Sequence, residues 1–276
     1  MKFRKEQIRL GFLITVVGLL WWLVIAFPFP KHADKSLSLF TSDPAERRVI
    51  SAAVQTPISE GACPVAIYEF RDGRHHWSGS GVCYSNANGA TLLMTVAHIF
   101  VKRDQPASFV VRKLTPHETR PTWCMKRIIK AGKQWGKNTD VAACEVVPLT
   151  FPLPQIRCDV DAAKADPALT RLYTFDEAIA IGLTNVGRKT LTSLVSGERV
   201  ALCGIVPEPD FESWYYLTDS TIGFGDGGTP YIDEKGSLYL AHGSVSSELS
   251  SETAKQFKLT VRTPGLVLGP VGVRKD

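Results

Sequence analysis

Short hydrophobic runs, rich in β-branched and aromatic residues, follow one another along most of the chain and are separated by turn residues. The runs are VAIYEF at 65–70, GSGVCYS at 79–85, TLLMTVAHIF at 91–100, SFVVRKL at 108–114, VAACEVV at 141–147, EAIAIGL at 177–183, ERVALCGIV at 198–206, SWYYL at 213–217 and SLYLAHGSV at 237–245. Turn pairs such as Asp72-Gly73 and Asn88-Gly89 stand between them. Many short strands with such punctuation predict an all-β barrel or sandwich.

Helical patterns are scarce after the first 30 residues. We expect one short helix at Ala45–Val54, and at Asp159–Ala168 either a second helix or a loop. The chain has no internal repeat. The β-rich part is therefore expected to form the bulk of the folded protein.

The N-terminus carries a different signal, an uncharged run of 18 residues from Leu10 to Phe27. As a helix it would reach about 27 Å, close to the hydrocarbon thickness of about 30 Å. Four Lys or Arg and one Glu precede it, and a basic flank stays in the cytoplasm. We expect a cytoplasmic N-terminus at 1–9, a transmembrane signal anchor at 10–29, a linker at 30–59, and the main domain outside the cytoplasm, in the periplasm or on the cell surface.

Net charge argues against a nucleic-acid partner. The formal charge is +5, of which residues 1–9 supply +3, so only +2 remains for the rest of the chain. A nucleic-acid-binding domain usually carries a larger basic excess. The basic excess is better explained as a topology signal for the membrane.

The six cysteines contain no C-x-x-C pair, so a zinc ribbon or a thioredoxin-like motif is not expected. They are Cys63, Cys83, Cys124, Cys144, Cys158 and Cys203. Outside the cytoplasm they could form up to three disulfides, or they could be small buried hydrophobic residues. Spacing leaves both alternatives open, and neither a metal nor a cofactor is predicted.

Three short segments carry residues suited to acyl-transfer chemistry. Thr95-Val96-Ala97-His98 ends a hydrophobic run, Asn138-Thr139-Asp140-Val141-Ala142 begins another, and a glycine-rich turn at 218–230 follows (TDSTIGFGDGGTP). In such chemistry an imidazole accepts a hydroxyl proton, a buried carboxylate fixes its tautomer, and backbone N–H groups face the developing oxyanion. These segments are therefore the candidate site.

Together the three segments resemble the chymotrypsin-fold serine proteases, especially their HtrA-like and related bacterial or viral trypsin-like branches. His98 matches the histidine of the T-A-A-H motif, with Val96 in place of the first alanine, and Asp140 matches the aspartate of D-[IV]-A. Residues 218–230 align without a gap to T-D-x-x-I-x-x-G-[ND]-S-G-G-P, apart from Gly227 and Thr229. The intervals of 42 residues from His98 to Asp140 and 87 from Asp140 to Gly227 are also close to those of the family.

The resemblance implies two antiparallel six-stranded barrels over residues 60–255, with a C-terminal tail at 256–276. It implies catalytic positions at His98, Asp140 and Gly227, and oxyanion-hole amides at Gly225, Asp226 and Gly227. Substrate-binding positions are implied at Thr221, Phe224, His242 and Gly243. His242 falls 15 residues after Gly227, where glutamate-selective relatives place a histidine, although a buried, hydrogen-bonded His242 is an equal alternative.

The glycine at 227 is the departure that decides the function. Gly227 stands where the family has its nucleophilic serine, and glycine has no oxygen with which to form an acyl-enzyme. We therefore expect an inactive protease homologue that binds a peptide or protein in the former substrate cleft. The alternatives are an active serine endopeptidase, with serine lost only in this variant or a hydroxyl of Thr229, Ser220 or Thr221 serving instead, and a structural envelope protein with a vestigial cleft.

Overall fold

The computed structural model describes residues 62–85, 90–115, 118–135, 140–161, 171–182, 187–206, 214–269 and 271. Within these ranges, no helix combines the length and the apolar character needed to cross a membrane. The anchor predicted at 10–29 and the helix predicted at Ala45–Val54 lie outside them, as do residues 162–168 of the second predicted helix.

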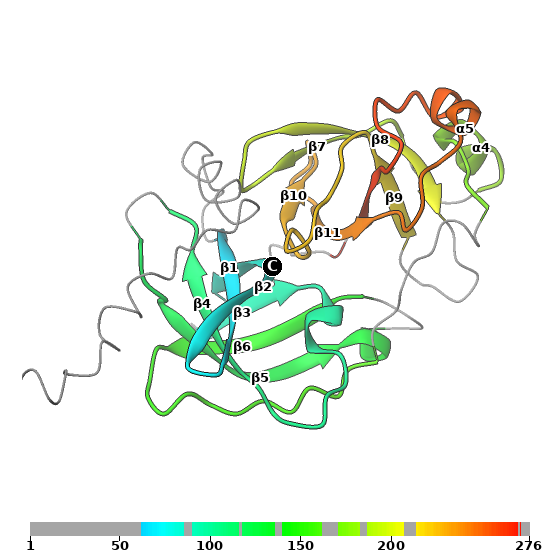
Figure 1. The fold of residues 1–276 in the computed structure, drawn as a ribbon. Coiled ribbons are helices and arrows are strands. Elements are labelled where there is room, and N and C mark those ends of the chain that lie inside the picture. Colours follow the sequence, from blue (N-terminus) through cyan, green and yellow to red (C-terminus); the bar gives the residue numbers. More distant parts are fainter. Residues whose placement is uncertain are drawn as a thin grey trace, which may run out of the picture. The chain divides into compact units, whose positions relative to one another are not determined.

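The first half of the described chain forms a closed antiparallel barrel in the order β1-β2-β3-β6-β5-β4 (Figure 1). Its strands are β1 (Ala62–Arg71), β2 (Arg74–Ser85), β3 (Thr91–Thr95), β4 (Ser108–Lys113), β5 (Trp123–Ala131) and β6 (Ala142–Pro148). The Asp72-Gly73 turn joins β1 to β2 with positive φ at both residues, as the tight turns of twisted hairpins require. Short 3-10 helices follow β3, as η2 (Ala97–Phe100), and β5, as η3 (Gly132–Trp135).

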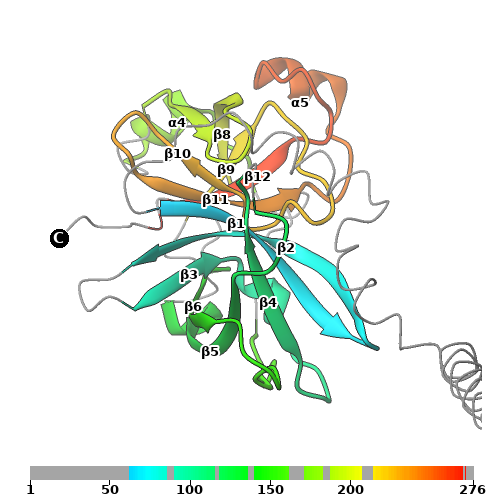
Figure 2. The same cartoon turned by 90° about the vertical axis from the view of Figure 1, so that its left-hand side faces the viewer.

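The second half forms another closed antiparallel barrel, in the order β10-β11-β12-β9-β8-β7. Its strands are β7 (Thr190–Ser193), β8 (Arg199–Val206), β9 (Trp214–Thr218), β10 (Pro230–Ile232), β11 (Leu238–Ser244) and β12 (Gly265–Gly269). Figure 2 shows this barrel packed on the first, with the helix α5 (Ser251–Gln256) on its outer side. The predicted all-β class with two six-stranded barrels is confirmed.

One hydrophobic core runs through both barrels. The largest cluster of buried residues includes Val65, Ile67 and Phe109 from the first barrel, and Tyr215, Leu240 and Leu266 from the second. A second cluster around Leu191, Tyr239 and Val267 lies within the second barrel. The facing walls of the barrels therefore share apolar surface removed from water, which fixes one barrel against the other.

The prediction of a strand at 177–183 is wrong, because residues Phe175–Ala180 form the helix α4. Thr174 caps this helix: its hydroxyl accepts from the Glu177 amide, and the Glu177 carboxylate accepts from the Thr174 amide. Such a capping box satisfies amides that a short helix otherwise leaves free. Phe175 and Ala178, three residues apart, then bury one face.

The second barrel extends beyond residue 255. β12 (Gly265–Gly269) pairs with β11 and β9 and closes the barrel, although these residues were predicted to belong to a tail. The run is short and two prolines flank it, so its pattern alone does not distinguish it from a loop. All six cysteines are free thiols, and four of them are buried.

Candidate functional site

His98 is positioned by the tight turn that follows β3. The strand ends at Thr95, and residues Ala97–Phe100 continue as a 3-10 helix rather than as the predicted strand. The His98 amide donates to Asp140 Oδ1 at 2.8 Å, and the His98 ring nitrogen Nδ1 lies 2.8 Å from Asp140 Oδ2. Backbone and ring are thus both held by one carboxylate, which fixes the direction of the imidazole.

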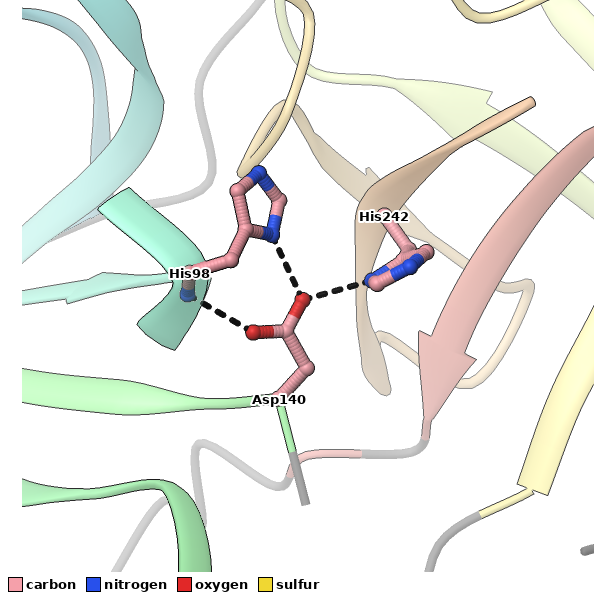
Figure 3. A group of neighbouring side chains, drawn as sticks. All are labelled: His98, Asp140 and His242. Carbon is pink, nitrogen blue, oxygen red and sulfur yellow. Dashed lines mark hydrogen bonds and ion pairs between the residues drawn. The ribbon is translucent and has the colours of Figure 1, made fainter. Parts of the chain in front are cut away.

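Asp140 lies just before β6 and is fully buried. Its Oδ2 also lies 2.5 Å from Nδ1 of His242, which comes from β11 of the second barrel (Figure 3). The two imidazoles meet edge to face with ring centroids 5.4 Å apart. Asp140 therefore holds a histidine from each barrel, and an Nδ1–H on both rings would leave both Nε2 atoms free to act elsewhere.

The environment of Asp140 keeps it ionised. Burial alone would raise the pKa of this carboxyl, but hydrogen bonds from His242 and His98, together with the charges of those rings, outweigh that effect and hold its pKa below the ordinary value. A buried carboxylate that accepts several hydrogen bonds behaves in this way. At neutral pH the site therefore contains a negative charge beneath two imidazoles.

Gly227 lies directly in front of the His98 ring. A Cβ atom at Gly227 would stand 3.1 Å from His98 Nε2 and 3.2 Å from Cε1. A hydroxyl on that Cβ would be within hydrogen-bond reach of Nε2. The structure thus brings together His98, Asp140 and Gly227, the three positions singled out from the motifs.

The glycine-rich turn is anchored to the first barrel. The Ser80 amide of β2 donates to the Gly227 carbonyl at 2.7 Å. Gly228 has φ +83, and a Cβ there would lie 1.9 Å from the Ser80 carbonyl oxygen, so only glycine allows so close an approach. Gly225 has φ +85 and packs against the Trp77 ring. These contacts hold the turn in one place beside His98.

The amides of the turn divide into engaged and free groups. Asp226 N–H donates to the Gly223 carbonyl at 3.2 Å, and Asp226 Oδ2 accepts from the Gly223 amide at 2.8 Å. Within the described ranges, the N–H groups of Gly225 and Gly227 donate no hydrogen bond. Two of the three predicted oxyanion-hole amides are therefore available to a ligand.

His98 and Gly227 both face an open cleft of about 540 Å³. Of the residues predicted to bind substrate, Phe224, His242 and Gly243 line this cleft and Thr221 does not. Sequence reasoning missed several further lining side chains, among them Trp77, Arg103 and Ser244. No motif pointed to them, because they come together only when the two barrels meet.

None of the hydroxyl groups weighed as substitutes for the nucleophile lines the cleft. Thr229 is buried, while Ser220 and Thr221 lie before the turn and outside the lining. Among the described residues, Ser78 and Ser244 supply the cleft's hydroxyls. The Ser244 hydroxyl donates to the Ile222 carbonyl and accepts from the Ile222 amide, which leaves it poorly placed to react.

His98, Asp140 and His242 also form the one group of described residues whose ligand atoms could surround a metal ion, all within 4.8 Å of one another. Zinc bonds of about 2.0–2.2 Å in a tetrahedral site keep ligand atoms about 3.3 Å apart. The N–O separations of 2.8 and 2.5 Å are shorter and match charge-assisted hydrogen bonds. The geometry favours hydrogen bonds between Asp140 and the two histidines over ligation of a metal ion.

The two six-stranded barrels confirm, at the level of the fold, the resemblance inferred from the three motifs. The chain has the double-barrel fold of chymotrypsin-type proteases. No protein-family model matches the sequence, and neither does any curated protein.

Solved structures similar to the chain include two proteases. One is the tobacco vein mottling virus protease, with 13% identity over 78% of this chain and 82% of that one, and a TM-score of 0.34. The other is the active form of the Rv3671c protease of M. tuberculosis, with 16% identity over 83% and 82% of the two chains, and a TM-score of 0.35.

Proposed function

We propose that this protein is a catalytically inactive homologue of a serine protease that binds a peptide or protein segment in the former substrate cleft. The observation that carries the proposal is the position of Gly227, where a Cβ would stand 3.1 Å from His98 Nε2. Without a side-chain oxygen at this point no acyl-enzyme forms there, and only the residual effects of oxyanion hole and binding remain.

The surroundings of Gly227 are typical of a ligand-binding cleft rather than of a cleft that has lost its function. The cleft is bordered by Phe224, whose side chain is 90% exposed, and this places an aromatic group where a bound chain would pass. Exposed aromatic residues beside a hollow are typical of recognition sites. This argument favours a binding protein over a purely structural envelope protein.

Membrane attachment is part of the proposal and rests on the apolar run at 10–27 with its basic flank. The main domain would then lie outside the cytoplasm. Protease added to cells stripped of their outer envelope should digest the domain without lysis of the inner membrane. A domain shielded until lysis, or a mature N-terminus that begins after the run, would contradict this arrangement.

Peptide retention tests the binding function. A random peptide pool passed over the immobilised protein should be retained, and mass spectrometry should recover the retained peptides intact. In Gly243→Trp retention should be lost, because nothing lies within 4 Å of a Cβ at Gly243 and the indole would occupy the cleft.

The control for this experiment is Ile179→Trp, which adds an indole on the exposed face of α4 and should leave retention unchanged. Equal retention by Gly243→Trp and the unmodified protein would contradict binding in this cleft. Peptide cleavage faster than in His98→Ala would contradict the proposed inactivity.

A further inference from the structure

Because Gly227 lacks a side chain, the position in front of His98 Nε2 is open to a ligand atom. We propose that the cleft recognises the C-terminal carboxylate of a peptide chain, with one oxygen at the Gly225 and Gly227 amides and the other against His98 Nε2. This inference rests on the proposed binding function and adds the chemical group that the cleft selects.

The first support is the space itself. A Cβ at Gly227 would lie 3.1 Å from His98 Nε2 and 3.4 Å from Val96 Cγ2. In a protein with serine at this position, Cβ and Oγ fill the volume. Here the volume belongs to the cleft that Gly227 lines, so a carboxylate oxygen can approach the ring to hydrogen-bond distance.

The second support is the pair of free amides. Among the described residues, neither Gly225 N–H nor Gly227 N–H has an acceptor, and both residues line the cleft. The turn that carries them is held by Asp226, which binds the Gly223 amide, and by Ser80, which binds the Gly227 carbonyl. Preorganised backbone N–H groups of this kind bind anionic oxygens, including terminal carboxylates.

The third support is charge. Two arginines and one glutamate line the cleft, and Arg103 forms an ion pair with Glu69 at 2.5 Å. Arg71 contributes a further positive charge, and its ion pair with the exposed Asp72 is long, at 4.0 Å. The side chains that line the cleft are therefore net positive before either histidine is counted. The negative charge of the Asp140 carboxylate beneath the histidines is offset when His98 carries a proton on both nitrogens, and the cleft then favours an anionic group over a neutral one.

Binding of this group requires a proton donor at Nε2 of His98. Nδ1 of His98 is directed at Asp140, and an oxygen anion at Nε2 needs a donor there, so the ring must carry protons on both nitrogens. Asp140 and His242 face this ring directly, and Glu69, Arg71, His76 and Arg103 are the other titratable or charged groups of the cleft wall. The buried Asp140 carboxylate compensates the imidazolium charge.

The test compares three fluorescein-labelled random peptide pools by fluorescence anisotropy with the full chain. One pool has free C-termini and no Asp or Glu, the second is the same pool with C-terminal amides, and the third is amidated but contains Glu. We expect the free-acid pool to bind roughly tenfold to a hundredfold more tightly than its amide, as charge-assisted hydrogen bonds allow.

Two variants locate the effect. Gly227→Ala puts a methyl group in front of Nε2 and should abolish the preference for the free acid, whereas Gly187→Ala, which adds a methyl in open space outside the cleft, should retain it.

The outcomes separate the two proposals. Equal binding of the acid and amide pools overturns the carboxylate inference and leaves the binding function standing. If the amidated Glu pool matches the free acid, the site selects side-chain carboxylates and the commitment to C-termini is wrong. Binding of none of the pools overturns both proposals.

Discussion

At the scale of single residues, the site is built around a carboxylate shared by two histidines. Asp140 accepts from the His98 amide through one oxygen and contacts both imidazoles through the other. These three hydrogen bonds offset the cost of burying the negative charge of Asp140. Its loss should therefore affect both the stability of the fold and the orientation of His98.

Replacement of the Asp140 carboxylate should change how the free energy of unfolding depends on pH. Because the pKa of Asp140 lies below its ordinary value, the charge stabilises the fold fully above about pH 4 and ceases to do so as the pH falls through the folded-state pKa. Asp140→Asn should lower the free energy of unfolding by about 3 kcal/mol at neutral pH and by much less in strong acid.

Urea unfolding of Asp140→Asn and of the unmodified protein, from neutral pH to strong acid, measures the difference in their free energies of unfolding. The control is Asp72→Asn, at an 87% exposed turn position with φ 53 that asparagine tolerates, and it should change little at any pH. A stability loss in Asp140→Asn that is the same at every pH would contradict the account.

Adjacent glycines of the turn should respond differently to one added methyl group. Gly227 has no positive φ, and its Cβ would meet the His98 ring at 3.1 Å, which a small shift of the ring relieves. Gly228 has φ +83 and would bring Cβ to 1.9 Å from the Ser80 carbonyl.

Gly227→Ala should therefore cost under about 1 kcal/mol of unfolding free energy and Gly228→Ala more than about 2 kcal/mol. Thermal unfolding of both variants checks the contrast. Equal losses would mean that the turn does not have the conformation described here.

At the scale of elements, local sequence patterns predicted most strands and the order of the motifs, while contacts between distant segments escaped them. β5 was missed because the charged side chains of Lys126 and Arg127, which pair with Glu145, interrupt its hydrophobic pattern. The contact between His242 and Asp140 joins residues 102 positions apart. No spacing rule within one sequence reveals such a pairing, which depends on how the barrels pack.

The helix α4 shows how a cap can decide between two elements. The short apolar run EAIAIG suits a strand or a helix, and the capping box at Thr174 selects the helix. Thr174→Ala should destabilise this turn by about 1 kcal/mol, whereas Thr174→Ser keeps the hydroxyl and should not.

Amide exchange at Ala178 and Ile181 provides the measurement, because their N–H groups bond to Thr174 and Glu177 within this helix. Both should exchange faster in Thr174→Ala. Unchanged exchange in that variant would show that packing of Phe175, rather than the cap, maintains the helix.

At the scale of the whole molecule, the shared core should make the two barrels unfold together. Leu240 belongs to the second barrel and is fully buried in the cluster that also contains Val65 of β1. Leu240→Ala should cost about 2–5 kcal/mol. The amides of β1 should lose as much protection against exchange as those of β11.

Hydrogen exchange on the full chain tests this cooperativity, with Ile179→Ala on the exposed face of α4 as the variant that should change neither barrel. Loss of protection confined to the second barrel would mean that each barrel is stable alone. In that case the cleft between them would not be fixed by the shared core.

We propose that this fold retains the imidazole and carboxylate of a protease but has glycine at the position of the nucleophile. Fluorophosphonate labelling tests it most directly, because the reagent reacts with an activated serine. We predict no labelling of the unmodified chain, labelling of Gly227→Ser, and none when Gly227→Ser is combined with His98→Ala. Labelling of the unmodified chain that disappears in His98→Ala would contradict the claim.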